Sequence, residues 1–483
     1  MAIRYNRFAP SRNAGAGHRS SGDGDNNKTD GTAGISHAIT FLRKPFSMLL
    51  MTRLQGSLPL GIDKALYLSA CVVLAAFPAL MFVKPSLSNT CYGLLLGWSV
   101  IALATGGRAA VAEYGCILRR YWPFMLAMAA LPLALLLQQL LTGADDPHVP
   151  YLYLRFALFI VLVPGLLRLG RRGMQNIQWG FVACALISAL WLHEVAAAGR
   201  PSHVGFSNVI PFGNLALLTG MLAVISTGWN RPGEYVQVGV KLLAGFAGLY
   251  ASYMSGTRGG WIAVPVLVLV SLMASRKLKR IHKGAGLLVL AGFMAATWLS
   301  SDRVQQRTME TVSELSQFAH HVTLDTSTGI RLQLWRASLK MLQAHPWAGV
   351  GPENYEQALK GLAEQHVVTP LAATMPHAHN DILHTGATLG IPGLIAIFAL
   401  YLVPVAFFLY HLRSNDRDTQ VASAMGLALC CGFMVFGLTE AMFGTTLVNA
   451  CYSLIMAVCF AYVVSSKKAL RVQAASSPPR IAT

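Results

Sequence analysis

Residues 121–141 read YWPFMLAMAALPLALLLQQLL and contain no Asp, Glu, Lys or Arg. A helix of this length crosses the hydrocarbon core of a bilayer, which is about 30 Å thick. Lipid offers the backbone no hydrogen-bond partners, so a crossing segment is either a helix or a strand of a closed barrel. The length of this segment and its lack of alternating polar residues favour a helix.

Apolar segments of similar length recur along most of the chain. Its 483 residues are 54% hydrophobic and 12% charged, whereas a soluble domain carries about 25% charged residues. The sequence therefore predicts an all-α integral membrane protein with about twelve spans. The spans are expected at residues 65–83, 88–105, 121–141, 152–167, 177–197, 212–228, 237–254, 259–274, 284–300, 388–410, 419–437 and 447–464.

Basic residues fall mainly in alternate short loops, and the opposite loops hold only Lys84, Arg200 and Arg258. Because Lys and Arg keep loops on the cytoplasmic side, the basic loops and both termini are expected there. This distribution accounts for the formal charge of +18. No basic stripe interleaved with aromatic residues is present, so nucleic acid is not an expected partner. The basic loops contain Arg108, Arg119, Arg120, Arg168, Arg171, Arg172, Arg231, Arg276, Lys277, Lys279, Arg280, Lys283, Arg413 and Arg417.

The predicted organisation has five parts. They are a disordered, basic cytoplasmic segment at 1–64, spans one to nine at 65–300, a periplasmic helical loop at 301–387, spans ten to twelve at 388–464 and a cytoplasmic tail at 465–483. The first 35 residues are rich in Gly, Ser, Asn and Arg, a composition typical of disorder. Eight cysteines lie in or beside the apolar segments without CxxC spacing, which argues against a disulfide framework.

The periplasmic loop is expected to form a helical cap. Apolar residues from Val304 to Val322 recur at helical spacing. A second helix is expected from just after Thr328 to Ala344, before His345-Pro346. A third is expected from Pro352, a residue favoured in the first turn, to about Gln365.

The first candidate functional motif is Ser255-Gly256-Thr257-Arg258-Gly259-Gly260, at the outer end of the seventh and eighth predicted spans. Glycines let the backbone approach a ligand, and the start of a helix attracts anions. The forked guanidinium of Arg258 suits a phosphate group. The alternative is an arginine in a tight turn that reaches the membrane surface.

The second motif, Thr328-Gly329-Ile330-Arg331, opens the second cap helix. Arg331 shares a helix face with Trp335 and Ser338. A cation in the first turn opposes the helix dipole, which an anionic ligand would compensate. The alternative is a surface arginine on an amphipathic helix.

The third motif, Met375-Pro376-His377-Ala378-His379-Asn380-Asp381, precedes the tenth span. A histidine there can act as a general base near neutral pH. A helix beginning near Ala378 would place His379 and Asn380 at its N-terminus. On such a helix the side chains of His377 and His379 would point about 200° apart. No third His or Cys ligand stands at standard spacing, so no metal is expected. A structural interfacial histidine is the alternative.

The three motifs in this order resemble the O-antigen ligase family, part of the O-antigen ligase/polymerase superfamily. The similarity lies in TSTGIRLQLWRASLKMLQAHPWAGVGPENY (326–355) and HAHNDILHTGATLGIPG (377–393), where His379-Asn380, Gly390 and Gly393 match the pattern H-N-x9-G-x2-G. SGTRGGW (255–261) matches the family's arginine turn, and NVIPFGN (208–214) matches its Pro-x-x-Gly start of the sixth span. The resemblance covers nearly all of residues 65–464.

This resemblance implies a metal-independent, inverting membrane glycosyltransferase of the GT-C type, without a cofactor, in the bacterial inner membrane. It would move O-antigen from undecaprenyl diphosphate to lipid A–core at the periplasmic face, as a step of lipopolysaccharide biosynthesis. Arg258 and Arg331 would bind the diphosphate, and His379 would be the general base. Supporting residues would be His377, Asn380, Glu440, Arg200 and Gly259. Glu440 either orients His379 or an arginine, or is an exposed loop carboxylate.

Two other functions remain open from the sequence. An O-antigen polymerase or a protein O-oligosaccharyltransferase would use the same donor with a different acceptor. A transporter of the lipid-linked glycan would keep ionisable groups near the membrane midplane. The predicted spans are nearly free of such groups, and Arg155 and Lys241 lie near span ends, which favours an enzyme.

Overall fold

The computed structural model describes residues 62–143, 148–196, 203–204, 207–274, 302–319 and 324–476, with a few isolated positions between 281 and 299. The predicted N-terminal segment, Arg200 and most of the ninth predicted span lie outside these ranges. The elements in chain order are α2 (Ile62–Leu80), α3 (Pro85–Arg120), α4 (Trp122–Thr142), α5 (His148–Met174), α6 (Ile177–Ala196), β1 (His203–Val204), β2 (Ser207–Asn208), α7 (Val209–Ile225), η1 (Ser226–Trp229), α8 (Tyr235–Met254), α9 (Arg258–Trp261), α10 (Ala263–Ala274), α12 (Asp302–Ala319), α13 (Ser327–Ala344), α14 (Tyr355–Glu364), η2 (Ala372–Thr374), α15 (Asp381–His411), α16 (Arg417–Gly437), η3 (Met442–Gly444) and α17 (Thr446–Ser476).

Eight of the described helices are long and apolar enough to cross a membrane: α3, α4, α5, α6, α7, α15, α16 and α17. The protein is therefore a multi-pass helical membrane protein. The apolar segments 64–80 and 259–274 are also helical but shorter. The total of about twelve spans stays a prediction, because the ninth falls mostly outside the described residues.

Several elements differ in extent from the prediction. α3 runs past the predicted end at residue 105 and bends at Gly107, whose φ of +61° is readily adopted by glycine. α17 continues to Ser476, beyond the predicted end at residue 464. A pair of two-residue antiparallel strands, β1 and β2, lies between α6 and α7, and no strand was expected there.

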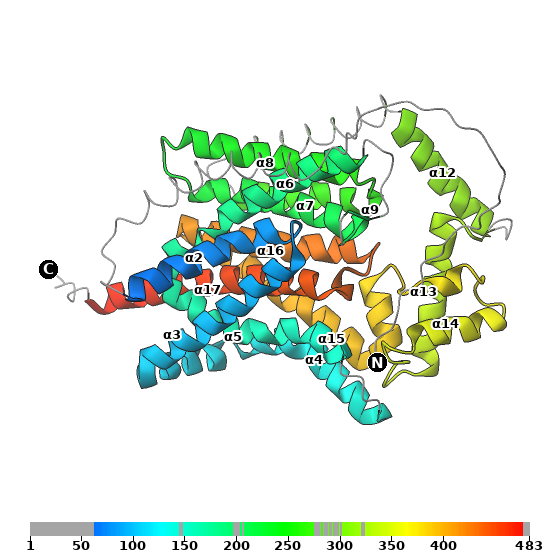
Figure 1. The fold of residues 1–483 in the computed structure, drawn as a ribbon, viewed down its shortest axis with the longest axis horizontal. Helices are drawn as coiled ribbons and strands as arrows, with labels where there is room; N and C mark the ends of the chain where they lie inside the picture. The colour runs from blue at the N-terminus through cyan, green and yellow to red at the C-terminus, as the bar shows by residue number, and fades with distance from the viewer. Residues whose placement is uncertain are drawn as a thin grey trace, which may run out of the picture. The chain divides into compact units, whose positions relative to one another are not determined.

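α17 is the central helix of the bundle (Figure 1). In its most apolar 18-residue window, 94% of the residues are buried, against 17% in the corresponding window of α3. α17 packs on α5 and α16, α5 packs on α3 and α4, and α15 packs on α4 and α16. Aromatic rings join these layers: the centroid of Phe124 in α4 lies 5.0 Å from that of Phe407 in α15 and 4.7 Å from that of Phe460 in α17.

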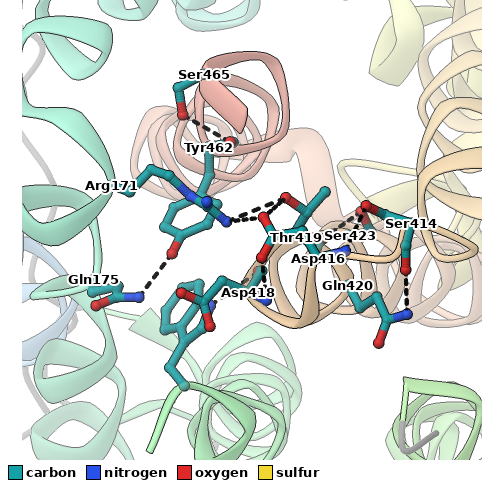
Figure 2. A network of polar contacts seen from close by, with 11 residues as sticks. Arg171, Gln175, Ser414, Asp416, Asp418, Thr419, Gln420, Ser423, Tyr462 and Ser465 are labelled. Carbon is teal, nitrogen blue, oxygen red and sulfur yellow. Dashed lines mark hydrogen bonds and ion pairs between the residues drawn. The ribbon is translucent and has the colours of Figure 1, made fainter. Parts of the chain in front are cut away.

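A polar network joins α5, α16 and α17 (Figure 2). Arg171 forms an ion pair with Asp416 and lies over the ring of Tyr462, 4.7 Å from its centroid. Asp416 also caps α16 by accepting a hydrogen bond from Asp418 N at 3.2 Å. The loops of Arg171 and Asp416 were predicted to lie on the same side of the membrane, and they are in contact.

Helices α12, α13 and α14 lie in the segment 301–387, where helices were predicted, and they are grouped at one end of the bundle (Figure 1). That they form a periplasmic cap stays a prediction. α13 packs on α15, and a second apolar core forms around Leu334, Met341, Tyr355, Leu359 and Ala387. α13 begins at Ser327 because the Thr326 hydroxyl accepts a hydrogen bond from Gly329 N at 3.0 Å.

The predicted start of the third cap helix at Pro352 is wrong. α14 begins at Tyr355, and Pro352 lies in the turn before it, where Asn354 N donates to Gly351 O. Gly351 has a φ of +86°, so the chain enters the helix through a left-handed position that glycine adopts without strain.

Candidate functional site

The N-terminus of α15 is fixed by an asparagine cap. Asn380 Oδ1 accepts a hydrogen bond from Leu383 N at 3.0 Å, which satisfies one of the free N–H groups that begin every helix. Asn380 Nδ2 donates to the carbonyl oxygen of Leu438 at 3.2 Å. Asn380 therefore also ties the start of α15 to the loop 438–445, which connects α16 to α17.

Asp381 ties the same loop at its other end. Its side chain is 4% exposed, Oδ1 accepts a hydrogen bond from Phe443 N at 3.3 Å, and Oδ2 accepts one from Tyr401 OH at 3.1 Å. The absence of a side chain at Gly437 makes room, since a Cβ there would lie 2.6 Å from Asp381 Oδ2. The ring of Phe443 is stacked on that of Phe433 with 5.4 Å between centroids, so the loop is anchored in the bundle.

Glu440 lies between these two ties and is 1% exposed. Its Oε2 is 3.0 Å from His379 Nδ1, and its Oε1 is 3.3 Å from His377 Nε2. The two imidazole rings meet edge to face with 4.4 Å between their centroids. One buried carboxylate therefore contacts both histidines, and the alternative of an exposed loop carboxylate at Glu440 is wrong.

Neither histidine lies on a helix. His379 has a φ of +49°, a left-handed conformation that is uncommon and costly for a residue with a side chain. Trp335 Nε1 donates to the carbonyl oxygen of Ala378 at 3.1 Å, which holds the segment between the histidines against α13. The predicted helix start near Ala378 and the opposite directions of the two rings are therefore wrong. α15 begins at Asp381, and the turn before it brings both rings to Glu440.

The charge states follow from these contacts. Burial alone would raise the pKa of Glu440, but the hydrogen bond with His379 and the charges of His377, His379 and Arg331 hold that pKa below its usual value. Burial lowers the pKa of His377 more than the Glu440 carboxylate raises it. At neutral pH the site therefore combines an ionised Glu440 with a neutral His377.

Arg331 lies in the first turns of α13 and is partly buried. Its charge is close enough to lower the pKa of Glu440. Trp335, one turn further along the same helix, contacts the histidine segment through Ala378. The predicted face of α13 that holds Arg331 and Trp335 is thus turned toward the histidines and Glu440.

The arginine turn reaches the same loop from another direction. Arg258 begins α9, and the structure describes only its backbone. A Cβ on Gly259 would lie 2.0 Å from Thr439 Oγ1, and one on Gly260 would lie 2.5 Å from Asn214 Oδ1. The turn therefore packs closely against Thr439, the residue before Glu440. Position 259 has no room for a side chain beside Thr439, which explains the glycine there.

Sequence reasoning assigned no role to Asp381, Tyr401 or Trp335. An ionisable residue such as Asp381 at the start of an apolar span is a signal that could have been used, because such residues are rare in membrane helices unless they have partners. Nothing local in the sequence links Trp335 to Ala378. Of the predicted site residues, Arg200 alone lies wholly outside the described part of the chain.

The site also has the composition of a metal centre. His377, His379 and Glu440 each offer one ligand atom, and these atoms all lie within 4.8 Å of one another. Within the described ranges this is the only such group of three His, Cys, Asp or Glu side chains. The sequence offered no third ligand near the His-x-His pair, and the fold supplies one from Glu440.

Comparison with known proteins finds a similarity over the part of the chain that holds most of this site. Residues 243–398 match the family described as O-antigen ligase. This part of the chain is therefore similar to the O-antigen ligase family. The resemblance drawn from the motifs is thereby confirmed. The matched segment includes Arg258, Arg331, His377 and His379 and ends before Glu440.

Two curated relatives are similar over part of their length. An O-antigen ligase of Escherichia coli is 23% identical over 230 residues, which are 47% of this chain and 50% of the relative. An uncharacterized protein of Haemophilus influenzae is 22% identical over 257 residues, which are 52% of this chain and 64% of the relative. The similarity thus spans about half to two-thirds of these relatives.

Proposed function

We propose that this protein is an O-antigen ligase, which transfers O-antigen from undecaprenyl diphosphate to lipid A–core. The observation that carries the proposal is the contact between His379 and Glu440 beside the segments that bear Arg258 and Arg331. Glycosyl transfer from a diphosphate needs a base for the acceptor hydroxyl and positive charge for the leaving group. This site offers both.

His379 is the general base in this proposal. With Glu440 accepting a hydrogen bond from Nδ1–H, the ring keeps the lone pair on Nε2 free. Nε2 takes the proton of the acceptor hydroxyl while the hydroxyl oxygen bonds to the anomeric carbon. The bond from that carbon to the diphosphate oxygen breaks, and undecaprenyl diphosphate leaves from the opposite side with inversion. A general base of this kind contributes about 10²–10⁴-fold.

Arg258 and Arg331 neutralise the charge that develops on the diphosphate. Guanidinium groups bind phosphate oxygens through two parallel hydrogen bonds. Their positive charge takes the part that a divalent metal plays in other transferases, so the proposed reaction uses neither a metal nor an organic cofactor. His377 shapes the acceptor site, and Asn380, Arg200 and Gly259 are further supporting residues.

We place the reaction at the periplasmic face of the bacterial inner membrane, with both termini in the cytoplasm and a GT-C-like architecture. The basic loops support this orientation. Tyr462, in the network with Arg171, follows Thr446 by 16 residues of α17, or about 24 Å of helix. The polar network around Arg171 and the histidine site therefore lie near opposite ends of α17. Both substrates carry lipid tails, which suits a site at the membrane surface.

An O-antigen polymerase or a protein O-oligosaccharyltransferase would use the same residues on the same donor, so the acceptor distinguishes these functions. A glycan transporter is less well supported. Lys241, fully buried in α8, donates to Gln178 Oε1 at 2.6 Å and to Ser226 O at 2.9 Å. Its ammonium group thus belongs to a local network near the start of its helix.

The test is transfer in vitro with purified protein, lipid-linked O-antigen and three acceptors offered separately: lipid A–core, a second lipid-linked glycan unit and an acceptor peptide. We expect transfer to lipid A–core in buffer containing EDTA. Transfer only to the glycan unit or to the peptide would replace the ligase by one of the alternatives. Loss of transfer in EDTA with recovery in Mg²⁺ or Mn²⁺ would refute the metal-free mechanism.

A further inference from the structure

The two histidines and Glu440 lie close together. Ligand atoms around a tetrahedral zinc ion, with bonds of about 2.0–2.1 Å, lie roughly 3.3 Å apart. Glu440 Oε1 is 3.3 Å from His377 Nε2, and Glu440 Oε2 is 3.0 Å from His379 Nδ1. Both carboxylate–imidazole spacings are therefore close to that of a zinc site, and the ligand atoms of the three side chains all lie within 4.8 Å of one another.

The backbone around this group is held from several sides. Asn380 and Asp381 fix both ends of the loop that carries Glu440, and Trp335 fixes the peptide between the histidines. His379 keeps a left-handed backbone conformation that a flexible segment would abandon. Pre-organised ligands lose little conformational freedom when an ion binds.

We propose that His377 Nε2, His379 Nδ1 and Glu440 bind a divalent transition-metal ion of zinc-like chemistry, and that this ion inhibits the protein. Two imidazole nitrogens and one carboxylate oxygen suit zinc, whereas Mg²⁺ and Ca²⁺ prefer oxygen ligands alone. Three protein ligands leave the fourth position open to water. The site is therefore selective for zinc-like ions over the alkaline-earth ions.

Inhibition follows from the tautomer of His379, and this part of the inference rests on the proposed function. The catalytic tautomer has its proton on Nδ1 and its lone pair on Nε2. An ion bound to Nδ1 moves the proton to Nε2, because a neutral imidazole carries one proton. The ring then has no lone pair for the acceptor hydroxyl, and Glu440 is bound to the ion. Zinc and the acceptor proton thus compete for one imidazole.

Zinc binding is measured directly on the full chain in detergent, after treatment with EDTA and desalting, by titration of ZnCl₂ against a chromogenic chelator. We expect one tight site, at least tenfold weaker in His377→Ala and in Glu440→Gln and unchanged in His345→Ala, whose exposed histidine lies at the end of α13. A tenfold excess of MgCl₂ should not displace the zinc. Equal zinc affinity in wild type and His377→Ala, or displacement by MgCl₂, would overturn the site.

The inhibitory effect is measured in the transfer assay with the same preparations. ZnCl₂ should abolish transfer by wild type and by His345→Ala at the concentrations that fill the site, and EDTA should restore it. Zinc that fills the site without slowing transfer would overturn inhibition alone. Absence of transfer to any acceptor by the metal-free wild type would instead count against the proposed function and leave the binding result standing.

Discussion

His379 and Glu440 are 61 residues apart in the chain, yet the imidazole Nδ1 lies 3.0 Å from the carboxylate Oε2. The carboxylate belongs to the loop between α16 and α17, and the histidine belongs to the turn before α15. The contact therefore depends on the packing of three helices. In our account this contact sets the tautomer and the direction of the catalytic base.

Replacing Glu440 by Gln should lower turnover about 10²–10³-fold, since an amide neither fixes the tautomer of His379 nor stabilises its charged form. The KM for the lipid-linked donor should change little. Initial rates with saturating acceptor measure this. Glu356→Gln, at an exposed position of α14, is the matched control and should keep the wild-type rate. A Glu440→Gln variant as fast as its control would remove this carboxylate from the mechanism.

Two substitutions at Asn380 separate its two contacts. Asn380→Ser keeps a good N-cap but cannot reach Leu438 O, whereas Asn380→Ala loses both. We expect the free energy of unfolding of Asn380→Ser to stay near the wild-type value. The free energy of unfolding of Asn380→Ala should fall by about 1 kcal/mol, because the cap is lost. Both variants should lose turnover, because the loop that carries Glu440 is released at one end. Full turnover in Asn380→Ser would show that the tie to Leu438 is dispensable.

Arg331→Ala and Arg258→Ala should each abolish transfer while the protein still inserts and folds. Lys at either position should restore little, since an ammonium group cannot form the parallel hydrogen bonds of a guanidinium. Arg336→Ala, on an exposed face of α13, serves as control in both assays. Transfer rates are compared with expression and with gel-filtration profiles. A fully active Ala variant would exclude that arginine from diphosphate binding.

Acid should destabilise the folded state partly through His377. Its pKa lies below 6.5 in the folded chain and returns to about 6.5 on unfolding, so the unfolded chain binds the proton first as pH falls. The contribution of His377 to the stability of the folded state is thus fully present above pH 6.5 and is lost as the pH falls below that value. The thermal midpoint of metal-free protein should fall less between pH 7 and pH 5 in His377→Ala than in wild type or His345→Ala. Identical slopes in all three would contradict the assignment.

Glu440 titrates at lower pH. Its folded pKa is depressed below 4.5, so its contribution to stability is present above that value and is lost only as pH falls through the folded pKa. Glu440 therefore remains ionised across the neutral range in both states. It should add to acid unfolding only below the pH range in which His377 acts.

The sequence predicted much of the helical framework and the three motifs whose residues form the site. Apolar length identifies helices such as α4 and α16, and the start expected just after Thr328 lies within about two residues of the start of α13 at Ser327. These features depend on neighbours in the chain, so they can be read locally. α14 was placed three residues too early, because a proline is as well suited to the preceding turn as to a first helical position.

The geometry of the two histidines could not be predicted in this way. Their directions depend on the φ of +49° at His379, which is maintained by contacts from α13 and the loop 438–445. The ties from Asn380 to Leu438 and from Asp381 to Phe443 span about 60 residues each. Such pairings follow from tertiary packing and leave no periodic signal.

Transfer by His379→Ala is the most direct test of the central claim. The H-N-x9-G-x2-G pattern selects His379 as the base, although both histidines contact Glu440. With lipid-linked donor and lipid A–core in EDTA, His379→Ala should lose nearly all turnover and still bind donor, and His377→Ala should be milder. Wild-type turnover in His379→Ala, with His377→Ala inactive, would contradict the account and move the base to His377.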